Sequence, residues 1–375
     1  MLNNSQFDIE VDIFGSETHE IPKITIAVPA KNEEDVILSC LSSLANQEEI
    51  DLRSIKAVFV LNNCTDGTYE AIKSFETQLK FPVVTARVNL PSGFQTAGWA
   101  RKLAMDCAAT LTAENGYILS TDADSIPDSD WVARKHDEFI HGADAVAGFV
   151  TADWSELSKM PEEILSLGAL EWEYQGLSAE LEAKADPQSH DPWKRHNQNC
   201  GASMAIKAHL YTSIGGLPPL PVGEDRALFD AVRKKDGKIR HSLNAHVTAS
   251  ARMVGRASGG MADALRLRGS QDYLCDDILE PADDLLYRNI MRSDARKAWK
   301  KGNFENWILK SGFRADNTIF ESFGLAWENL EKSNSNLAYK RLQSNHLPLE
   351  LTKIRNHIDN IDRLNLKMAN LKMAS

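Results

Sequence analysis

The sequence contains few cysteines. Its 375 residues include only five, at positions 40, 64, 107, 200 and 275. No two of them have the spacing of a zinc site or of a CxxC redox motif. We therefore expect reduced, partly buried thiols, which are typical of a cytosolic protein.

The sequence also lacks long apolar runs. No stretch approaches about 18 consecutive apolar residues, the length from which a membrane-spanning helix is inferred. The polar, acidic N-terminus has no basic start followed by an apolar run, so it does not resemble a secretory signal. Both absences predict a cytoplasmic protein without a transmembrane segment.

Positive charge is in deficit. The chain has 42 Lys+Arg against 53 Asp+Glu, which gives a formal net charge of −11. This balance argues against non-specific binding to nucleic acid or anionic membranes through overall charge, although a local basic patch is compatible with it. The hydrophobic fraction of 43 % and the charged fraction of 25 % are ordinary for a globular protein.

Short apolar runs alternate with helical patterns from residue 21 onwards. We predict strands at 24–28, 56–61, 83–86, 117–121, 144–150, 202–206 and 239–249, and helices at 33–45, 66–79, 97–111, 130–140, 162–183 and 225–235. A long loop is expected at 186–199. The alternation favours a parallel α/β sheet covered by helices on both faces. Ligands of such sheets bind at the carboxyl ends of the strands.

The chain becomes helical throughout after about residue 262. A stripe of apolar residues follows steps of three and four, at Leu351, Ile354, Ile358, Ile361, Leu364, Met368 and Leu371. It predicts packing on the chain's own helices or, alternatively, the seam of a homodimer. We expect an N-terminal extension at 1–20, an α/β domain at 21–261 and a C-terminal helical region at 262–375.

Polar residues follow the first two strands. Pro29, Ala30, Asn32 and Glu33 lie in VPAKNEE, where a strand turns into a helix and backbone N–H groups can bind a nucleotide phosphate. Alternatively, Asn32 caps the helix and Glu33 occupies its first turn. Asn62 lies in LNNCTDGT, whose amides could contact a base or simply build a turn.

Two carboxylates follow the fourth strand, at Asp122 and Asp124 in STDADSIPD. Such a pair can bind a hard cation such as Mg²⁺ or Mn²⁺, or reach a ribose hydroxyl. Asp-x-Asp pairs also arise by chance, as at Asp128 and Asp130, so the preceding strand is what distinguishes the first pair.

Further charged candidates lie on a helix start and in a glycine-containing loop. Glu224 and Asp225 precede a helical pattern, where a carboxylate can be a helix cap or a general base. Arg252 and Arg256 lie among glycines in ARMVGRASGG, which suits a loop that closes on a diphosphate. The alternative is two solvated surface arginines. Arg101 is a further basic candidate.

The order of these segments resembles glycosyltransferase family 2, an inverting family with the GT-A fold. The resemblance covers residues 21–260 through VPAKNEE, LNNCTDGT, GWARKLAMDCA, STDADSIPD, NCGASMAIKAHLYTSIGGLP and GEDRALFDAVRKKDGKI. It implies a mixed, mainly parallel sheet flanked by helices, and it does not cover the C-terminal helical extension.

The resemblance also implies roles for individual residues. Nucleotide and donor contacts would come from Pro29, Ala30, Asn32, Glu33, Asn62, Arg101 and Asp122, the last at the ribose or sugar. Asp124 would bind Mg²⁺ or Mn²⁺. Asp225 would be the catalytic base, with Glu224 beside it as an acceptor contact or alternative base. Arg252 and Arg256 would hold the departing nucleotide diphosphate.

Three departures from the family pattern qualify these roles. Asn62 and Asn63 stand where members often carry acidic residues that contact the base, which leaves the donor nucleotide open. The QxxRW signature of membrane-embedded polymer synthases is replaced by ARMVGR, which favours single-sugar transfer. His246 could be a metal ligand, but its place within an expected strand favours a structural role.

The predicted function is the transfer of one sugar from a nucleotide-sugar donor to an acceptor hydroxyl of a small molecule, a glycan or a lipid-linked carrier. Alternatives are a retaining enzyme of the glucosyl-glycerate type and a non-catalytic nucleotide-sugar-binding module. A nucleotidyltransferase is disfavoured because the first strand lacks a following glycine-rich loop with a lysine. Trp154, Trp172 and Trp193 could shape an acceptor pocket or, equally, pack in the core.

Overall fold

The computed structural model describes residues 9–15, 21–253, 255, 260–268, 273–315 and 319–373. Contacts divide the chain into two compact units. The first comprises residues 1–159, 198–232 and 237–263, and the second residues 160–197, 233–236 and 264–375. Residues 160–197 thus group with the C-terminal helices. The division expected from the sequence, at 261/262, remains a prediction.

A nine-stranded sheet runs through the described part of the first unit, in the order β1-β4-β3-β2-β5-β8-β7-β9-β6. The pairings β4–β3, β3–β2, β2–β5 and β7–β9 are parallel and the other four are antiparallel. The strands are β1 (Ile9–Phe14), β2 (Ile24–Ala30), β3 (Ile55–Asn62), β4 (Val83–Val88), β5 (Tyr117–Ser120), β6 (Ser125–Pro127), β7 (Ala145–Ala152), β8 (Met204–Lys207) and β9 (Ile239–Ala249).

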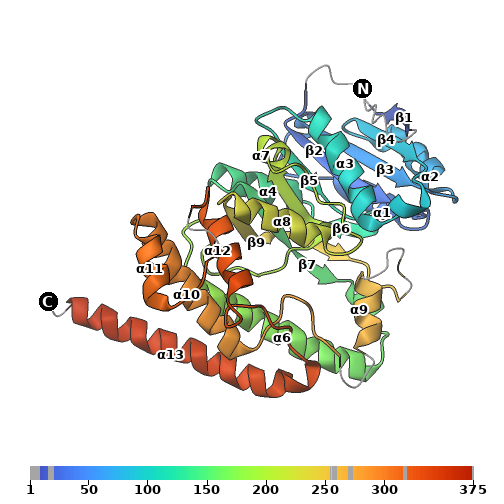
Figure 1. Ribbon diagram of the computed structural model, residues 1–375. Helices are drawn as coiled ribbons and strands as arrows, with labels where there is room; N and C mark the ends of the chain where they lie inside the picture. The colour runs from blue at the N-terminus through green and yellow to red at the C-terminus, as the bar shows by residue number, and fades with distance from the viewer. Residues whose placement is uncertain are drawn as a thin grey trace. The chain divides into compact units, whose positions relative to one another are not determined.

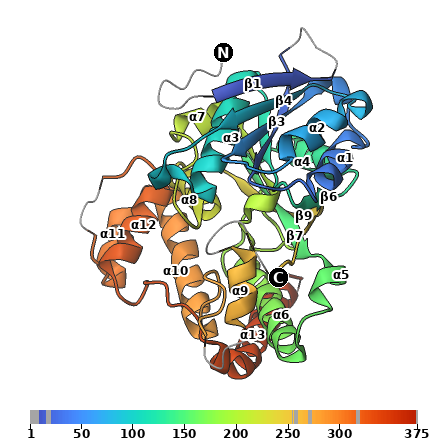
Figure 2. The same ribbon diagram turned by 90° about the vertical axis from the view of Figure 1, so that its right-hand side faces the viewer.

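Helices cover both faces of this sheet (Figures 1 and 2). One face packs against α1 (Ile37–Ala45), α2 (Thr68–Ser74) and α4 (Trp131–Ile140). The other packs against α3 (Ala97–Leu111), α7 (Ala208–Ser213) and α8 (Glu224–Lys234). In β2, Ile26 and Val28 belong to the first core and Ala27 to the second. Burial on both faces explains why this strand is a continuous apolar run.

The remaining short elements of the first unit connect these layers. They are α5 (Trp154–Leu157) and the 3₁₀ turns η1 (Leu52–Ser54), η2 (Glu76–Gln78), η3 (Ser92–Phe94) and η4 (Gly201–Ser203). All seven predicted strands are confirmed within a few residues. The sequence reading missed β1, which lies in the expected N-terminal extension and pairs with the sheet edge at β4, and the three-residue β6.

The second unit is helical in its described part. It contains α6 (Glu162–Ala185), α10 (Ala282–Lys300), α11 (Phe304–Ser311), α12 (Phe323–Ser333), η5 (Ser344–His346) and α13 (Leu347–Met373), while α9 (Met261–Leu267) begins at the boundary between the units. Figure 1 shows α6, α10 and α13 packed alongside one another. Leu351, Ile354 and Ile358 of α13 are buried in their shared core. The apolar stripe therefore packs on the chain's own helices over this part of its length.

The absences noted in the sequence have structural counterparts. None of the helices in the described part of the chain combines the length and apolar character needed to cross a lipid bilayer. All five cysteines are free thiols, and Cys40, Cys107 and Cys275 are buried.

Candidate donor and catalytic site

The site is built at one edge of the sheet, where β2, β3 and β5 end. Pro29 and Ala30 are the last residues of β2, Asn62 is the last residue of β3, and Asp122 and Asp124 lie in the connection from β5 to β6. The parallel pairing of these strands brings their carboxyl ends together.

The turn after β2 is tied to the turn after β3. The backbone of Asn32 has a φ of +56°, in the left-handed region that asparagine tolerates. Its Oδ1 accepts a hydrogen bond from the N–H of Thr65 (2.8 Å), and the N–H of Glu33 donates to Thr68 Oγ1 (2.8 Å). Helix α1 begins only at Ile37, with Val36 at its N-cap. The alternative role of Asn32 as a helix cap is therefore wrong.

The two asparagines after β3 differ in what they contact. Asn63 donates to the carbonyl of Leu90 (3.1 Å) and accepts from the N–H of the same residue (3.0 Å), so its amide fixes the turn. Asn62 is 2 % exposed, and its Oδ1 has no hydrogen-bond partner among the residues that the structure describes. A buried amide oxygen without a partner carries a desolvation cost that a bound donor group would remove.

Arg101 of α3 links three other segments of the chain through its hydrogen bonds. Its guanidinium donates to Asp122 Oδ1 (2.6 Å), Glu224 Oε1 (3.0 Å), Ser120 Oγ (3.1 Å) and the carbonyl of Gly201 (3.0 Å). Burial lowers the pKa of Arg101, but the negative charges of Asp122 and Glu224 outweigh it and the net pKa is raised. Arg101 thus joins the β5 end to the start of α8.

Gly201 and Asp225 complete this cluster. The N–H of Gly201 donates to Asp225 Oδ2 (2.8 Å), while Asp225 Oδ1 accepts from the N–H of Arg226 (2.8 Å). A Cβ on Gly201 would lie 2.5 Å from Arg101 Nη2, so a larger residue there would displace the guanidinium. Burial and the neighbouring Glu224 raise the pKa of Asp225.

A second cluster forms around Arg252, which follows β9. Its guanidinium donates to Glu33 Oε1 (2.5 Å) and Oε2 (2.7 Å) and lies 2.9 Å from Asp124 Oδ2. Glu33 is buried beneath this contact. The segment before Arg252 is held by Glu156, whose Oε2 accepts from the N–H of Ala251 (2.6 Å). Arg252 is therefore an ion-paired residue of the site and not a solvated surface arginine.

The carboxylates near Asp124 leave negative charge in excess. Burial, Asp122 and Glu33 raise the pKa of Asp124 to about 6, although Arg252 opposes them. Carboxylate oxygens under such mutual repulsion suit a hard divalent cation. The described residues contain no group of three or more His, Cys, Asp or Glu side chains that could hold a metal by itself. This arrangement fits Mg²⁺, which usually takes only one or two protein carboxylates and completes its shell with phosphate and water.

The remaining predicted residues have different outcomes. Arg256 lies outside the described residues. His246 lies within β9, and its ring contacts Thr151 Oγ1 through Nε2 (2.8 Å) and Asp128 through Nδ1 (3.0 Å), so both nitrogens have protein partners. Trp154, Trp172 and Trp193 are all exposed, and core packing is therefore wrong for them.

Sequence reasoning missed several supporting residues. Ser120, Gly201 and Glu156 make the contacts described above, and Cys40 Sγ lies 3.5 Å from the carbonyl of Asp122. Gly201 stands within a segment that the family resemblance already quoted. Nothing in the sequence distinguishes Glu156 from the other acidic residues of the chain.

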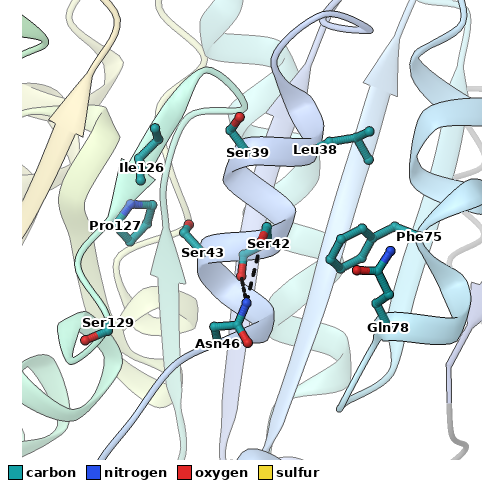
Figure 3. Close-up of a pocket in the computed structure, with 10 residues that line it drawn as sticks. All are labelled: Leu38, Ser39, Ser42, Ser43, Asn46, Phe75, Gln78, Ile126, Pro127 and Ser129. Atoms are coloured by element: carbon teal, nitrogen blue, oxygen red, sulfur yellow. Dashed lines mark hydrogen bonds between the residues drawn. The ribbon is translucent and has the colours of Figure 1, made fainter.

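A groove of about 600 Å³ lies elsewhere in the first unit, along α1 (Figure 3). It is lined by uncharged side chains of α1, η2 and the β6 region, namely Leu38, Ser39, Ser42, Ser43, Asn46, Phe75, Gln78, Ile126, Pro127 and Ser129. Without a charged side chain, its lining has no group that would neutralise a diphosphate.

Comparison with known families matches residues 25–193 to the family described as Glycosyl transferase family 2. This part of the chain resembles a family 2 glycosyltransferase. The matched range includes Arg101 and both carboxylates of the β5–β6 connection, whereas Asp225 and Arg252 lie beyond it. The match supports a glycosyltransferase, and the central sheet with its flanking helices and helical C-terminal region has the expected fold class. No curated protein sequence matches the chain.

Several solved glycosyltransferase structures are similar to the chain at low identity. TarS 1–349 of S. aureus, in complex with UDP-GlcNAc, is 17 % identical, with 90 % of this chain and 89 % of that chain covered and a TM-score of 0.46. The mannosyltransferase PcManGT of Pyrobaculum calidifontis, in complex with GDP-Man and Mn²⁺, is 16 % identical, with 95 % and 81 % covered and a TM-score of 0.47.

Glucosyl-3-phosphoglycerate synthase of Mycobacterium tuberculosis, in complex with Mn²⁺, UDP and phosphoglyceric acid, is also 16 % identical. The similarity covers 66 % of this chain and 77 % of that chain, with a TM-score of 0.40. No functional assignment of this chain follows from these three similarities.

Proposed function

We propose that the chain transfers a single sugar from a nucleotide-sugar donor to an acceptor hydroxyl, with inversion at the anomeric carbon. The observation that carries this proposal is the pair of hydrogen bonds that the buried Arg101 donates to Asp122 and Glu224. Asp122 is the proposed donor contact, and Glu224 is the neighbour of the proposed base, Asp225. The acceptor would be a small molecule, a glycan or a lipid-linked carrier. The cytoplasmic location expected from the sequence stays a prediction.

The residues around the site divide the chemistry between them. Pro29, Ala30, Asn32, Glu33 and Asn62 would line the nucleotide pocket. Asp122 would contact the ribose or sugar. Arg252 would leave its carboxylate partners and, together with Arg256, would bind the developing charge of the leaving diphosphate. Guanidinium groups are suited to this because they form paired hydrogen bonds with phosphate oxygens. Arg101 would act mainly by positioning Asp122 and Glu224, because its guanidinium already donates hydrogen bonds to both carboxylates.

Asp124 would hold Mg²⁺ or Mn²⁺, with Asp122 and Glu33 adding negative charge beside it. A bound divalent cation neutralises the diphosphate and so improves it as a leaving group. Arg252 pairs with Glu33 and Asp124 and would reduce the repulsion between these carboxylates before the donor arrives.

Asp225 would accept the proton of the acceptor hydroxyl while the hydroxyl oxygen attacks the anomeric carbon. Its two carboxylate oxygens are oriented by the N–H groups of Gly201 and Arg226. Because burial and Glu224 raise its pKa, more of it is protonated at low pH than of an ordinary aspartate. We expect kcat/KM to fall as pH falls through this raised pKa, and the fall should begin at a higher pH than the usual aspartate pKa of about 3.9.

Donor binding is tested by thermal shift with UDP-, GDP-, ADP- and dTDP-sugars, with Mn²⁺ or with a chelator. A bound donor raises the apparent Tm by mass action. Asp124→Ala should lose the metal-dependent part of the shift. Asp130→Asn is the matched control, because Asp130 belongs to the second Asp-x-Asp pair and contacts Arg134. If none of these donors shifts the Tm, the proposed donor class is wrong.

Turnover is tested by donor consumption and by NMR of the product anomer. Asp225→Asn should lower kcat by roughly 10²–10⁴-fold and leave the donor-induced Tm shift in place. Unchanged turnover in this variant would remove Asp225 as the base. A retained anomeric configuration would favour the retaining alternative, and donor binding without any turnover in the wild type would favour the binding module.

A further inference from the structure

Trp154, the first residue of α5, is a strongly exposed aromatic side chain of the first unit. It is 68 % exposed, the largest exposed fraction among the tryptophans that the structure describes. Its side chain makes no hydrogen bond or ring contact with the described part of the chain. A single exposed apolar side chain is ordinary on a protein surface, so its position decides whether it is a functional residue.

The direction of the strands places Trp154 at the same edge of the sheet as the candidate site. Strand β7 is antiparallel to β8, and β8 is antiparallel to β5, so β7 runs in the same direction as β5 and β2. It ends at Ala152, two residues before Trp154, just as β5 ends two residues before Asp122 (Figure 2). Trp154 and Asp122 therefore both follow strands whose carboxyl ends lie at one edge.

Helix α5 is also fixed to the segment that leads into Arg252. The N–H of Asp153 donates to the carbonyl of the last residue of β9 (2.8 Å). Glu156 Oε2 accepts from the N–H of Ala251 (2.6 Å). Because Arg252 belongs to the candidate site, these contacts attach α5 and its exposed indole to the site and not to a free loop.

Trp154 lies on the side of the site away from the proposed base contact. In the strand order, β7 is two places from β5 and four places from β3. At about 4.8 Å per strand, the end of β7 is roughly 10 Å from the end of β5 and roughly 19 Å from the end of β3. Asp124 follows β5, whereas Asn62 ends β3. The position of Trp154 thus suits a molecule bound beyond the donor sugar, and not the base.

The chain around the indole is polar and slightly acidic. From 153 to 159 it has two carboxylates, two serines and one lysine. Both serines, Ser155 and Ser158, are exposed. Such groups suit a sugar ring, whose C–H groups pack on an aromatic face while its hydroxyls form hydrogen bonds. An acyl chain would instead require a continuous apolar surface, and a polyanionic acceptor would be repelled by the carboxylates.

We propose that Trp154 stacks on a sugar ring of the acceptor, and that the acceptor is a neutral carbohydrate. The inference rests on the proposed function, because it names the acceptor of the same site. Trp154 is an acceptor-binding residue in this arrangement and takes no part in the proton transfer assigned to Asp225.

The test is ¹⁹F NMR of the full chain labelled with 5-fluorotryptophan. The chain has eight tryptophans, and the resonance that disappears in Trp154→Phe is that of Trp154. The probes are the neutral trisaccharides cellotriose, maltotriose, mannotriose and triacetylchitotriose, each with and without Mn²⁺ and UDP or GDP. At least one of them should shift the Trp154 resonance in a saturable way, with the other tryptophans as internal controls. A Trp154 resonance that no trisaccharide shifts overturns the proposal.

Variants separate the indole from its surroundings. Trp154→Ala should weaken binding of that trisaccharide by roughly 10-fold or more, because a stacked aromatic face contributes beyond its buried area. Trp154→Tyr, which keeps a ring, should bind within a few-fold of the wild type. Ile140→Ala is the matched control, since Ile140 is 65 % exposed but precedes the start of β7 and so belongs to the opposite edge of the sheet. Equal binding by Trp154→Ala and the wild type would contradict the assignment.

Other occupants give different results. Octyl glucoside, below its critical micelle concentration, that binds at Trp154 far more tightly than methyl glucoside would assign the indole to an apolar chain. A shift of the Trp154 resonance by uridine or guanosine alone would assign it to the base. Either result overturns the proposal.

The acceptor site and the proposed transfer can fail independently. Trp154→Ala should show the same donor-induced Tm shift as the wild type, because the donor contacts lie elsewhere. If a trisaccharide shifts the Trp154 resonance but no donor binds, the carbohydrate site is confirmed and the proposed transfer is wrong. If a donor binds and is turned over but no trisaccharide reaches Trp154, the transfer stands and the carbohydrate site is wrong.

Discussion

At the residue scale, the buried cation Arg101 organises one of the two clusters of the site. Arg101 holds Asp122, Glu224 and the backbone of Gly201 in place, and these groups come from three separate segments of the chain. The family resemblance implied that Arg101 lies near the diphosphate or the base of the donor. The structure instead engages its guanidinium with protein groups, which makes its first effect the positioning of the two carboxylates.

Replacement of Arg101 by Gln should destabilise the protein strongly. It leaves Asp122 and Glu224 without their shared cation, and removing one partner of a buried ion pair typically costs about 3–5 kcal/mol. Urea denaturation measures the free energy of unfolding. Arg53→Gln is the control, because Arg53 pairs with Asp51 on the surface and should change stability by less than about 1 kcal/mol. An equal loss in both variants would contradict the assigned role.

A second buried cation has no role in the proposed chemistry. Lys135 of α4 is fully buried; its Nζ donates to the carbonyl of Val146 (3.4 Å) and lies 5.3 Å from the centroid of the Trp131 ring. Burial lowers the pKa of Lys135 well below its usual value. The folded state therefore disfavours the proton that the unfolded chain binds at neutral pH.

Lys135→Met should accordingly stabilise the protein, by about 1–3 kcal/mol at pH 7. The gain should shrink as pH rises towards about 10.4, where lysine in the unfolded chain also loses its proton. Urea denaturation at pH 7 and pH 10 measures both effects, with Lys73→Met as the exposed control. A gain that does not depend on pH would point to improved packing instead of removed charge.

At the scale of elements, α3 packs closely against the segment that leads into α8. An added Cβ on Gly98 would lie 1.9 Å from the carbonyl oxygen of Leu220, so this backbone must move if Gly98 is replaced. The moved segment continues into Glu224 and Asp225. The glycine thus links the packing of a helix to the position of the proposed base.

Gly98→Ala should destabilise the protein by about 1–3 kcal/mol, as expected for overpacking, and should lower kcat without removing any group from the site. Gly93→Ala is the control, since a Cβ there has nothing within 4 Å. Thermal unfolding and turnover measured on both variants test the prediction. A Gly98→Ala protein with normal stability and turnover would show that the Leu220 segment adapts freely.

The elements themselves show what a sequence pattern can and cannot predict. Helix α3 and strand β9 have the predicted bounds, because each has a long and regular pattern. Strand β1 was missed because it is an edge strand with only partial burial, so its residues need not be apolar. Strand β6 has three residues and depends entirely on its pairing with β9.

At the scale of the whole molecule, all described contacts of the proposed donor site lie within the first unit. Donor binding should therefore slow hydrogen exchange in segments around residues 28–34, 60–68, 118–126, 199–204 and 222–228. It should leave α10 and the first turns of α13 unchanged, because slowed exchange follows local stabilisation. Mass spectrometry of exchanged peptides with and without the donor measures this. Protection in α10 or α13 would show that the second unit also responds to the donor.

The sequence by itself determined the alternation of strands and helices, the order of the charged motifs and the helical C-terminal region. These depend on local periodicity and on neighbouring residues, which a single chain displays directly. Asp122, Asp124, Asp225 and Arg252 were candidates from these segments, and the family resemblance assigned them to the site, although their roles remain proposals.

Only the tertiary structure decided which of these groups meet. The contacts of Arg101 with Glu224, and of Arg252 with Glu33, join residues 123 and 219 positions apart, and no local pattern specifies such a partner. Burial, which raises the pKa of Asp124 and Asp225, is likewise a property of the packed chain. The exposure of Leu309 and Leu364 follows the same rule, since a leucine is apolar in any sequence and only packing determines whether it is covered.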